Sequence, residues 1–351
     1  MSAASNPATS ASASTPAPEA PVRLFAYAMR AFDELGFFEE VCRERGVELG
    51  WTQDYPSLAN AGLARGYDVV SVMPSTIDRP LIQTWLDLGV RAIATRNIGV
   101  DHIDLDACRE LGMRVSHATY SPESVADYAI MLAMMCLRRM PQIMDRARVQ
   151  DYTLRGKMGR ALCDCTVGVV GTGRIGATVI NHLKGFGCKL LAFDVYPNER
   201  VAAEATYVEL DELLANSDVV TLHAPLTADN HHMIGERALG LMKPDAVLVN
   251  TARGGLVDTE ALIGALEVGR LSGGVALDVL EKEDGLYYAD RVGDVIENRP
   301  MAILRAFPNV ILTPHSAFYT DTDVRQMIEG AVEGALAMAT GHADECPLVV
   351  A

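Results

Sequence analysis

The chain has 351 residues, of which 49% are apolar and 22% are charged. This composition excludes fibrous, collagenous and wholly disordered proteins, and the length allows two domains with separate hydrophobic cores. The formal net charge is −16 and no basic cluster stands out in the sequence. Nucleic acid is therefore disfavoured as a partner, and an anionic substrate would need a local cation.

The first residues, the cysteines and the longest apolar stretch predict where the protein is located. Residues 1–20 contain only Ala, Ser, Pro, Thr, Asn, Met and one Glu, so we expect a disordered leader at 1–21 that is neither a signal nor a transit peptide. The seven cysteines show no paired metal spacing, which predicts reduced thiols and no metal. The longest near-continuous apolar stretch, 129–137, is far shorter than a membrane span. These features predict a cytoplasmic protein without membrane contacts.

Strand and helix patterns alternate from Val22 to about Val115. Apolar strands are expected in "VRLFAYA", "YDVVSVMP" and "VRAIATRN", and a helix in "RPLIQTWLDLG", which begins with proline and ends at glycine. The alternation predicts a small α/β unit with parallel strands.

A long helix is predicted next. Ser121 is a plausible N-cap, Pro122 suits the first helical position and Glu123 faces the positive helix end. The run at 129–137 is apolar on all faces, which leaves two interpretations open, a core helix or a subunit interface.

Six short apolar strands recur from Thr166 onward, with helical connectors between most of them. In an open parallel sheet, ligands bind outside the carboxyl ends of the strands. The residues that directly follow the six strands should therefore converge on one edge, and they are Gly171, Asp194, His223, Thr251, Asp278 and, after Pro314, His315.

The first of these strands leads into "VGVVGTGRIG". Gly171 permits a tight turn, Gly173 lets the backbone approach a pyrophosphate, and Gly176 lets helix and strand pack closely, while the helix N-terminus offers N–H groups to the phosphates. Asp194 ends the next strand, where a carboxylate accepts hydrogen bonds from the adenosine ribose and repels a 2'-phosphate. The pattern predicts NAD rather than NADP.

Reduction of a 2-keto acid needs a cation for the carboxylate and a proton donor for the carbonyl oxygen. Arg253 follows a strand and could form two parallel hydrogen bonds to a carboxylate. His315, otherwise a candidate core histidine, is the obvious acid for neutral pH because it ends the last strand. A carboxylate beside it would fix the tautomer, and the residues leave Asp278, Glu281, Glu283 and Asp284 open as that partner.

The combined motifs resemble the D-isomer-specific 2-hydroxyacid dehydrogenases. The resemblance lies in "VGVVGTGRIG", "TLHAPLT", "NTARGGLVDTEAL", "ALDVLEKEDG" and "NVILTPHSAFYT". "LFAYAMR", "RNIGVDHIDLDAC", "YSPESVADYA" and "GFGCKLLAFD" are similar to the D-lactate dehydrogenase branch, which includes the vancomycin-resistance enzymes. The resemblance covers about residues 22–335.

The resemblance implies an α/β fold of two Rossmann-like parallel-sheet domains, one flavodoxin-like and one dinucleotide-binding, with the active site in the cleft between them. The substrate domain would comprise 22–119 and 317–351, and the NAD-binding domain 120–316. The protein would be a homodimer through the cofactor domain, with the helix after Pro122 as a contact.

The resemblance also assigns roles. Arg253 would bind the substrate, His315 would be the acid/base residue, and Glu283 would be the carboxylate that pairs with His315. The resemblance thus selects Glu283 from the four carboxylates left open above. The expected substrate-binding residues are Met73, Ile98, Gly99, Tyr120 and Phe318. The expected cofactor-binding residues are Gly171, Gly173, Arg174, Ile175, Gly176, Asp194, His223, Ala224, Pro225, Asn230, Thr251, Ala252 and Asp278.

One departure concerns the substrate. Met73 stands where many D-lactate dehydrogenases have a tyrosine, and methionine is flexible and apolar. Pyruvate is the first expected substrate, followed by branched, aromatic or substituted 2-keto acids. Asp194 differs from the vancomycin-resistance enzymes, which look better suited to NADP there. Two other functions remain open, an NAD(H)-sensing corepressor of the C-terminal-binding-protein type and formate or phosphite oxidation.

Overall fold

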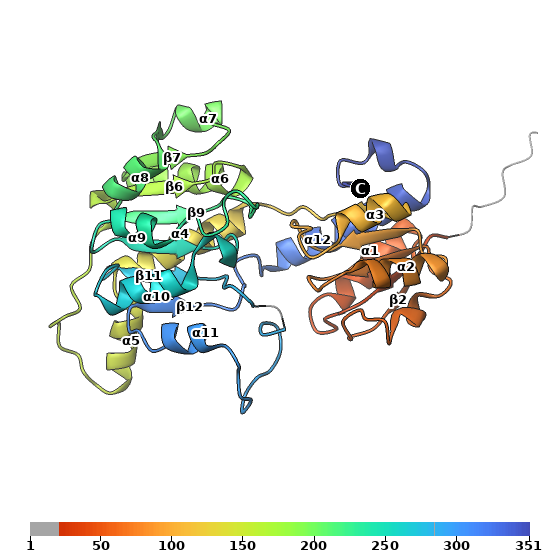
Figure 1. Ribbon diagram of the computed structural model, residues 1–351, viewed down its shortest axis with the longest axis horizontal. Helices are drawn as coiled ribbons and strands as arrows, with labels where there is room; N and C mark the ends of the chain where they lie inside the picture. The colour runs from red at the N-terminus through yellow and green to blue at the C-terminus, as the bar shows by residue number, and fades with distance from the viewer. Residues whose placement is uncertain (1–20, 284) are drawn as a thin grey trace, which may run out of the picture. The chain divides into compact units, whose positions relative to one another are not determined.

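The computed structural model describes residues 21–283 and 285–351, and these divide into two compact units. The first unit combines the described residues up to Ala118 with Ile328–Ala351, and the second is Thr119–Met327 (Figure 1). The predicted leader lies outside the described residues except for Pro21. The predicted domain boundary at residue 317 lies earlier in the chain than the observed one, because residues 317–327 belong to the second unit. Among the described helices, none has the length and apolar character to span a bilayer.

The first unit is built on a five-stranded parallel sheet in the order β2-β1-β3-β4-β5. Its strands are β1 (Arg23–Ala26), β2 (Glu48–Trp51), β3 (Val69–Val72), β4 (Ala92–Thr95) and β5 (Arg114–Ser116). Its helices are α1 (Leu35–Arg45), α2 (Arg79–Asp87), α3 (Leu105–Leu111) and the last part of α12 (Asp321–Ala339). Strands β3 and β4 are buried throughout, as expected for a parallel sheet with both faces covered.

Helix α2 shows why the sequence folds as predicted here. The Asp78 carboxylate accepts a hydrogen bond from the Leu81 N–H and caps the helix, and Pro80 lies in the first turn where its missing N–H costs nothing. The helix buries Trp85 completely against Tyr27 of the sheet, with ring centroids 5.6 Å apart. Packing of this aromatic pair fixes the helix on its face of the sheet.

The second unit is a seven-stranded parallel sheet in the order β12-β11-β10-β9-β6-β7-β8. Strand order reverses between β6 and β9, which pair directly, so this is the point where ligands bind in open α/β sheets. The six predicted strands are present, and the two-residue β8 was not predicted. The strands are β6 (Thr166–Val170), β7 (Lys189–Phe193), β8 (Thr206–Tyr207), β9 (Val219–Leu222), β10 (Val247–Asn250), β11 (Gly274–Leu277) and β12 (Val310–Leu312).

Helices cover both faces of this sheet. One hydrophobic core joins the sheet to α4 and α6, and another joins its opposite face to α8, α9 and α10. The helices are α4 (Glu123–Leu137), α5 (Met140–Arg148), α6 (Arg174–Leu183), α7 (Glu199–Ala202), α8 (Leu210–Asn216), α9 (Glu236–Leu241), α10 (Thr259–Glu267) and α11 (Arg299–Leu304). Single 3-10 turns lie at Ala61–Ala64, Leu162–Asp164, Lys184–Phe186, Gly254–Leu256 and Ala343–Glu345.

The structure of helix α4 bears on two predictions, the identity of its N-cap residue and the burial of its apolar faces. It begins at Glu123 with Pro122 as the N-cap residue, so Ser121 is not the cap; the Ser121 N–H instead donates to the Gln326 side chain over 2.7 Å. Most of the helix is buried against α6 and the sheet, as in a core helix. Met131 and Met134 nevertheless remain exposed, at 41% and 37%, so one face lacks a partner within the unit.

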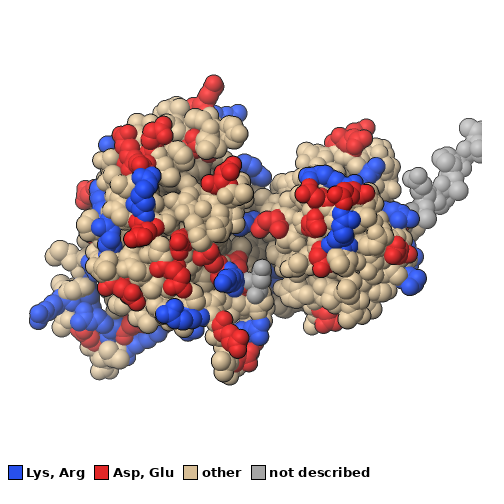
Figure 2. Space-filling view, viewed as in Figure 1, with Lys and Arg blue, Asp and Glu red and all other residues tan. Residues whose placement is uncertain are grey.

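A basic segment follows α4, contrary to the expectation that no basic cluster stands out. Residues 138–160 carry seven cations and only two carboxylates, and Figure 2 shows Lys and Arg side chains gathered in the region where Figure 1 places α5. The same segment exposes Met144, Val149, Tyr152, Leu154 and Met158. It is therefore both positively charged and apolar at its surface.

Candidate active site

The glycine-rich loop after β6 is shaped by close backbone contacts. Gly171 has a φ of +90°, a left-handed conformation that glycine adopts without strain, and a Cβ there would collide with the backbone of Ala224. A Cβ on Gly176 would collide with the Gly171 carbonyl oxygen. A Cβ on Gly173, in contrast, would meet no described atom within 4 Å. Two glycines thus close the turn and the third leaves its outer side open.

That open side lies at the start of α6. Gly173 is the N-cap residue and has no side chain to cap the helix, so the first-turn N–H groups of Arg174, Ile175 and Gly176 point outward without intrahelical acceptors. This is the arrangement that binds a pyrophosphate. The Arg174 guanidinium donates to the Tyr120 carbonyl over 3.0 Å, which ties the helix start to the segment before α4.

Asp194 directly follows β7 and faces the same loop. Its Oδ2 accepts hydrogen bonds from the Thr172 N–H (2.5 Å) and hydroxyl (3.1 Å), and its Oδ1 accepts from the Tyr196 N–H (2.9 Å). These bonds fix the position of the carboxylate beside the glycine loop. A ribose with free hydroxyls suits that carboxylate, whereas a 2'-phosphate would be repelled.

The ends of β9 and β10 supply neutral groups to this edge. Burial lowers the pKa of His223 to about 3, so its imidazole is uncharged at physiological pH, and its Nε2 lies 2.9 Å from the Thr221 hydroxyl. The Thr251 hydroxyl is buried and has no hydrogen-bond partner among the described residues. Such an orphaned group favours a polar ligand beside it.

The loop after β9 is held by its own side chains. The Asn230 amide donates to the Pro225 carbonyl and its oxygen accepts from the Thr227 N–H, each over 2.7 Å. The Ala252 N–H similarly donates to the Asn250 side chain over 3.0 Å. Together with the open glycine loop and the free helix start, these strand ends fit a dinucleotide, and the residues predicted to bind NAD lie along one sheet edge.

Asp278, which follows β11, has a structural role in the loop after β12. It is completely buried, and its two oxygens accept hydrogen bonds from the Thr313 hydroxyl (2.5 Å) and from the backbone N–H groups of Ser316 and Ala317 (2.9 Å each). The His315 N–H donates to the Asp278 carbonyl over 2.8 Å. One residue thus fixes the backbone on both sides of His315.

His315 and Glu283 form a close pair. The His315 Nδ1 lies 2.5 Å from Glu283 Oε1, while Glu283 Oε2 accepts a hydrogen bond from the Leu280 N–H over 2.7 Å. His315 has a φ of +50°, a left-handed conformation uncommon for residues other than glycine. The pairing occupies Nδ1 and leaves Nε2 as the nitrogen for a substrate.

The other carboxylates that the sequence left open have different positions. Glu281 lies 2.7 Å from His232 Nε2 and accepts hydrogen bonds from Thr259, so it is not the partner of His315. Asp284 lies outside the described residues. The geometry therefore agrees with the choice of Glu283 that the family resemblance implied.

Phe318 lies beside both His315 and Tyr120, and Arg253 lies near Tyr120. The Asn250 side chain donates to the Arg253 carbonyl (2.9 Å), which anchors the Arg253 backbone at the end of β10. Burial raises the pKa of Tyr120 to about 12, although the nearby Arg253 opposes the shift, so Tyr120 remains a neutral hydroxyl. Phe318 lies 6.4 Å from both the Tyr120 and the His315 rings, measured between centroids.

Two tyrosines of the loop after β11, Tyr287 and Tyr288, were not predicted as site residues from the sequence. The Tyr288 hydroxyl donates to the His315 carbonyl over 2.7 Å, and its ring lies edge-on to Phe318. The Tyr287 hydroxyl is buried without a partner among the described residues, and burial raises its pKa to about 12. No strand end or motif marks either residue, so only the path of the loop reveals them.

The predicted substrate residues of the first unit lie at the ends of β3 and β4. Ile98 and Gly99 follow Arg96, which is completely buried, pairs with Glu34 and donates to the carbonyls of Tyr27 and Ala28. Burial lowers the pKa of Arg96, and Glu34 opposes that shift. This ion pair fixes the start of the 97–99 loop.

Comparisons with known proteins agree with this geometry. A family model described as D-isomer specific 2-hydroxyacid dehydrogenase, NAD binding domain, matches residues 130–317. The chain is 46% identical over 305 residues to the D-specific alpha-keto acid dehydrogenase of Enterococcus faecalis, covering 87% of this chain and 93% of that protein. It is 38% identical over 311 residues to the aromatic 2-oxoacid reductase of Clostridium sporogenes, covering 88% and 93%. A solved structure of the pyruvate reductase of Chlamydomonas reinhardtii is similar, with a TM-score of 0.84, 36% identity, and 94% of this chain and 98% of that chain covered.

Proposed function

Because the chain belongs to the D-isomer specific 2-hydroxyacid dehydrogenases, we propose that it reduces a 2-keto acid to the D-2-hydroxy acid with His315 as the proton donor. The chain is an NAD-dependent oxidoreductase, and NADH supplies the hydride when it is bound. The observation that carries the proposal is the pair formed by His315 and Glu283, with Nδ1 and Oε1 2.5 Å apart, on the edge of the sheet that fits the dinucleotide.

Arg253 is proposed to hold the substrate carboxylate. Its guanidinium offers two parallel N–H donors, which match the two oxygens of a carboxylate. The Arg253 backbone is anchored at the end of β10, and Nη1 of its guanidinium donates a hydrogen bond to the Ala252 carbonyl over 2.8 Å. The backbone N–H groups of Ile98 and Gly99 are proposed as further donors to the carboxylate.

Glu283 is proposed to orient the His315 ring through Nδ1. With Nδ1 bound to the carboxylate, the imidazolium presents its Nε2–H to the keto oxygen and donates that proton as C2 receives the hydride. The remaining neutral imidazole keeps its proton on Nδ1, next to Glu283. Reduction therefore needs the protonated histidine, and oxidation of the hydroxy acid needs the neutral one.

Pyruvate is the first proposed substrate, and a larger aromatic or branched 2-keto acid is the second. Met73 supports the second choice, because it replaces a tyrosine of many D-lactate dehydrogenases. The Met73 side chain is 4% exposed and its Sδ lies 4.0 Å from the Arg30 guanidinium. A flexible thioether can adapt to a larger substrate side chain, whereas a rigid phenol ring would fill the space.

A Met73→Tyr variant is expected to lower the ratio of kcat/KM for phenylpyruvate to that for pyruvate by about 10- to 100-fold, since a filled pocket discriminates on that scale. The measurement is NADH oxidation over a panel of 2-keto acids. Met73→Leu, which keeps size and polarity, is the matched control and should leave the ratio unchanged. A wild-type chain that binds NADH and turns over no 2-keto acid would overturn the proposed function.

A homodimer through the second unit is also proposed. The segment 138–160 exposes a mixed basic and apolar surface in a chain whose net charge is −16, and Met131 and Met134 of α4 are exposed beside the core helix face. Apolar patches of this kind mark protein interfaces. The acidic surface of a second copy is complementary to the cations of this segment.

Leu154 tests the dimer because its side chain is 86% exposed and its replacement should not disturb the fold. Leu154→Asp is expected to shift the molar mass measured by light scattering from that of a dimer to that of a monomer. Val292→Asp, at a position 92% exposed in the loop after β11, is the control and should leave the dimer intact. A wild-type chain that is monomeric at every concentration tested would contradict the proposal.

A further inference from the structure

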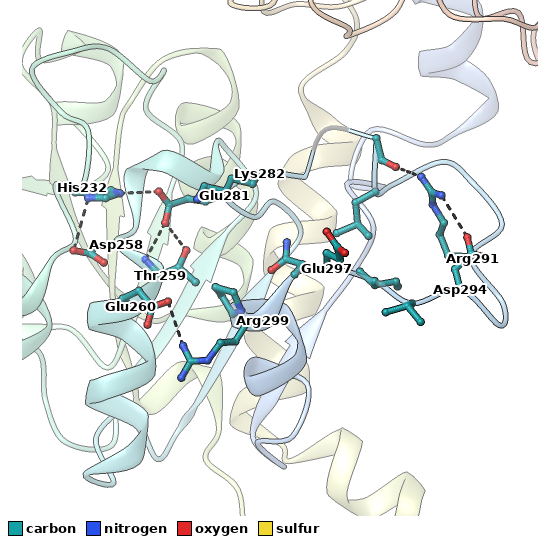
Figure 3. Close-up of a pocket in the computed structure, with 16 residues that line it drawn as sticks. His232, Asp258, Thr259, Glu260, Glu281, Lys282, Arg291, Asp294, Glu297 and Arg299 are labelled. Carbon is teal, nitrogen blue, oxygen red and sulfur yellow. Dashed lines mark hydrogen bonds and ion pairs between the residues drawn. The ribbon is translucent and has the colours of Figure 1, made fainter.

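A second cluster of chemically active side chains in the second unit shares no residue with the pair formed by His315 and Glu283. His231, His232 and Glu281 each offer one ligand atom, and these atoms lie within 4.8 Å of one another. Figure 3 shows His232 and Glu281 pointing toward each other at the wall of a cavity of about 650 Å³. The cysteine spacings predicted no metal, and this group contains no cysteine.

The two histidines are held in place by the backbone. The His232 N–H donates to the Gly255 carbonyl over 2.8 Å, and the Ile234 N–H donates to the Leu256 carbonyl over 3.0 Å. The imidazole rings of His231 and His232 stack with centroids 3.8 Å apart. His232 has a left-handed φ of 57°, which brings two consecutive side chains to one side of the chain.

Groups behind the cluster orient its atoms. His232 Nε2 lies 2.7 Å from Glu281 Oε1, and His232 Nδ1 lies 3.7 Å from an Asp258 carboxylate oxygen. The second Glu281 oxygen accepts hydrogen bonds from the Thr259 N–H (3.0 Å) and hydroxyl (2.5 Å). Hydrogen-bond donors behind the far oxygen of a glutamate are a support that metal ligands use.

The donor atoms of the cluster are a carboxylate oxygen and two imidazole nitrogens. Two cations of the same cavity are engaged elsewhere, since Arg291 pairs with Asp294 and Arg299 pairs with Glu260 (Figure 3). A carboxylate next to two imidazoles is a donor set of borderline softness, typical of zinc.

We propose that His231, His232 and Glu281 bind a divalent zinc ion, with a fourth position left to water. Two histidines and one glutamate are a known ligand set for zinc, at about 2.0–2.2 Å from the metal. The exposed His231 ring is free to turn toward the ion, and the ion replaces the proton between His232 and Glu281. The proposal is independent of the proposed function, because none of the three residues takes part in it.

A bound ion would join two segments that are far apart in the sequence. His231 and His232 belong to the connection between β9 and α9, and Glu281 begins the loop that carries Glu283. A ligand that binds only the folded chain stabilises it in proportion to its affinity. Zinc is therefore expected to raise the melting temperature as well as to bind.

The test uses the untagged full-length chain, stripped with EDTA and dialysed, and titrates zinc chloride by isothermal calorimetry. The wild type is expected to bind one zinc ion per chain and to melt at a higher temperature with zinc. His231→Ala, an exposed substitution that should not affect folding, is expected to weaken binding at least about tenfold and to abolish the thermal shift. Glu281→Gln, which keeps the shape of the side chain, is expected to weaken zinc binding as well.

His182 provides a matched control. Its Nδ1 lies 2.8 Å from an Asp127 oxygen, so it forms the same kind of pair, but it belongs to no group of three possible ligands among the described residues. His182→Ala should bind zinc as the wild type does. The proposal fails if the wild type does not bind zinc, if His231→Ala binds with unchanged affinity, or if Cys163→Ser, which removes an exposed thiol, abolishes binding.

Discussion

Arg253→Lys is expected to reduce kcat/KM for the 2-keto acid by at least about 100-fold, because an ammonium cannot form the two parallel hydrogen bonds that a guanidinium makes to a carboxylate. The loss should appear mainly in the KM for the keto acid. The KM for NADH should change little, because Asn250 holds the backbone at the end of β10 through the Arg253 carbonyl and not through its side chain. Steady-state kinetics with each substrate varied in turn measures both constants.

Arg237 offers a matched control for this experiment. Its two guanidinium nitrogens each lie 2.8 Å from an oxygen of Asp211 on the surface of the second unit. Arg237→Lys breaks a bidentate pair of the same kind, and it should leave both Michaelis constants unchanged. An Arg253→Lys enzyme with an unchanged KM for the keto acid would remove Arg253 from the substrate site.

His315→Asn is expected to lower kcat by about 10²- to 10⁴-fold, the usual contribution of a general acid. Glu283→Gln tests the partner through kcat. The proton donor acts from Nε2, and the Glu283 carboxylate orients the ring through Nδ1, so its replacement should lower kcat while the KM for NADH changes little.

The control is another pair of a histidine and a carboxylate. Asp127→Asn removes the carboxylate 2.8 Å from His182, and kcat should stay unchanged. An unchanged kcat in Glu283→Gln, or an equal fall in kcat in Asp127→Asn, would argue against Glu283 as the partner of the acid.

The strands of the second unit could be predicted because both faces of the sheet are covered. A parallel strand buried on both faces is an uninterrupted apolar run, and a glycine or a polar residue at its carboxyl end marks the boundary. The residues at those ends, among them Gly171, Asp194 and Asp278, follow from that pattern alone. The two-residue β8 (Thr206–Tyr207) has no such run, because its place is set by pairing with β7 and not by its composition.

Side-chain pairing in loops could not be read from the sequence. Glu281 and Glu283 are two residues apart in one loop, and only the backbone path decides that one faces His232 and the other His315. The contact of Tyr288 with the His315 carbonyl depends on the same path. The start of α4 was predicted at Pro122, whereas the structure has Pro122 as the N-cap residue and Glu123 as the first helical residue.

The proposed metal site could not be read from the sequence for a related reason. Two adjacent histidines have neither helical nor strand spacing, and the left-handed backbone of His232 brings their side chains to the same side of the chain. The third proposed ligand, Glu281, comes from a distant loop, so a search for spaced cysteines and histidines within one segment does not find it.

The left-handed backbone of His315, with a φ of +50°, has a consequence for trapping complexes of the enzyme with both of its ligands. Most residues strain in this conformation by about 1 kcal/mol or more, whereas asparagine adopts it more readily. An alanine at this position would lose the proton donor and also release the loop that carries Phe318. His315→Asn should keep the loop in place, which makes it the better inactive protein for crystals with NADH and an unreacted keto acid.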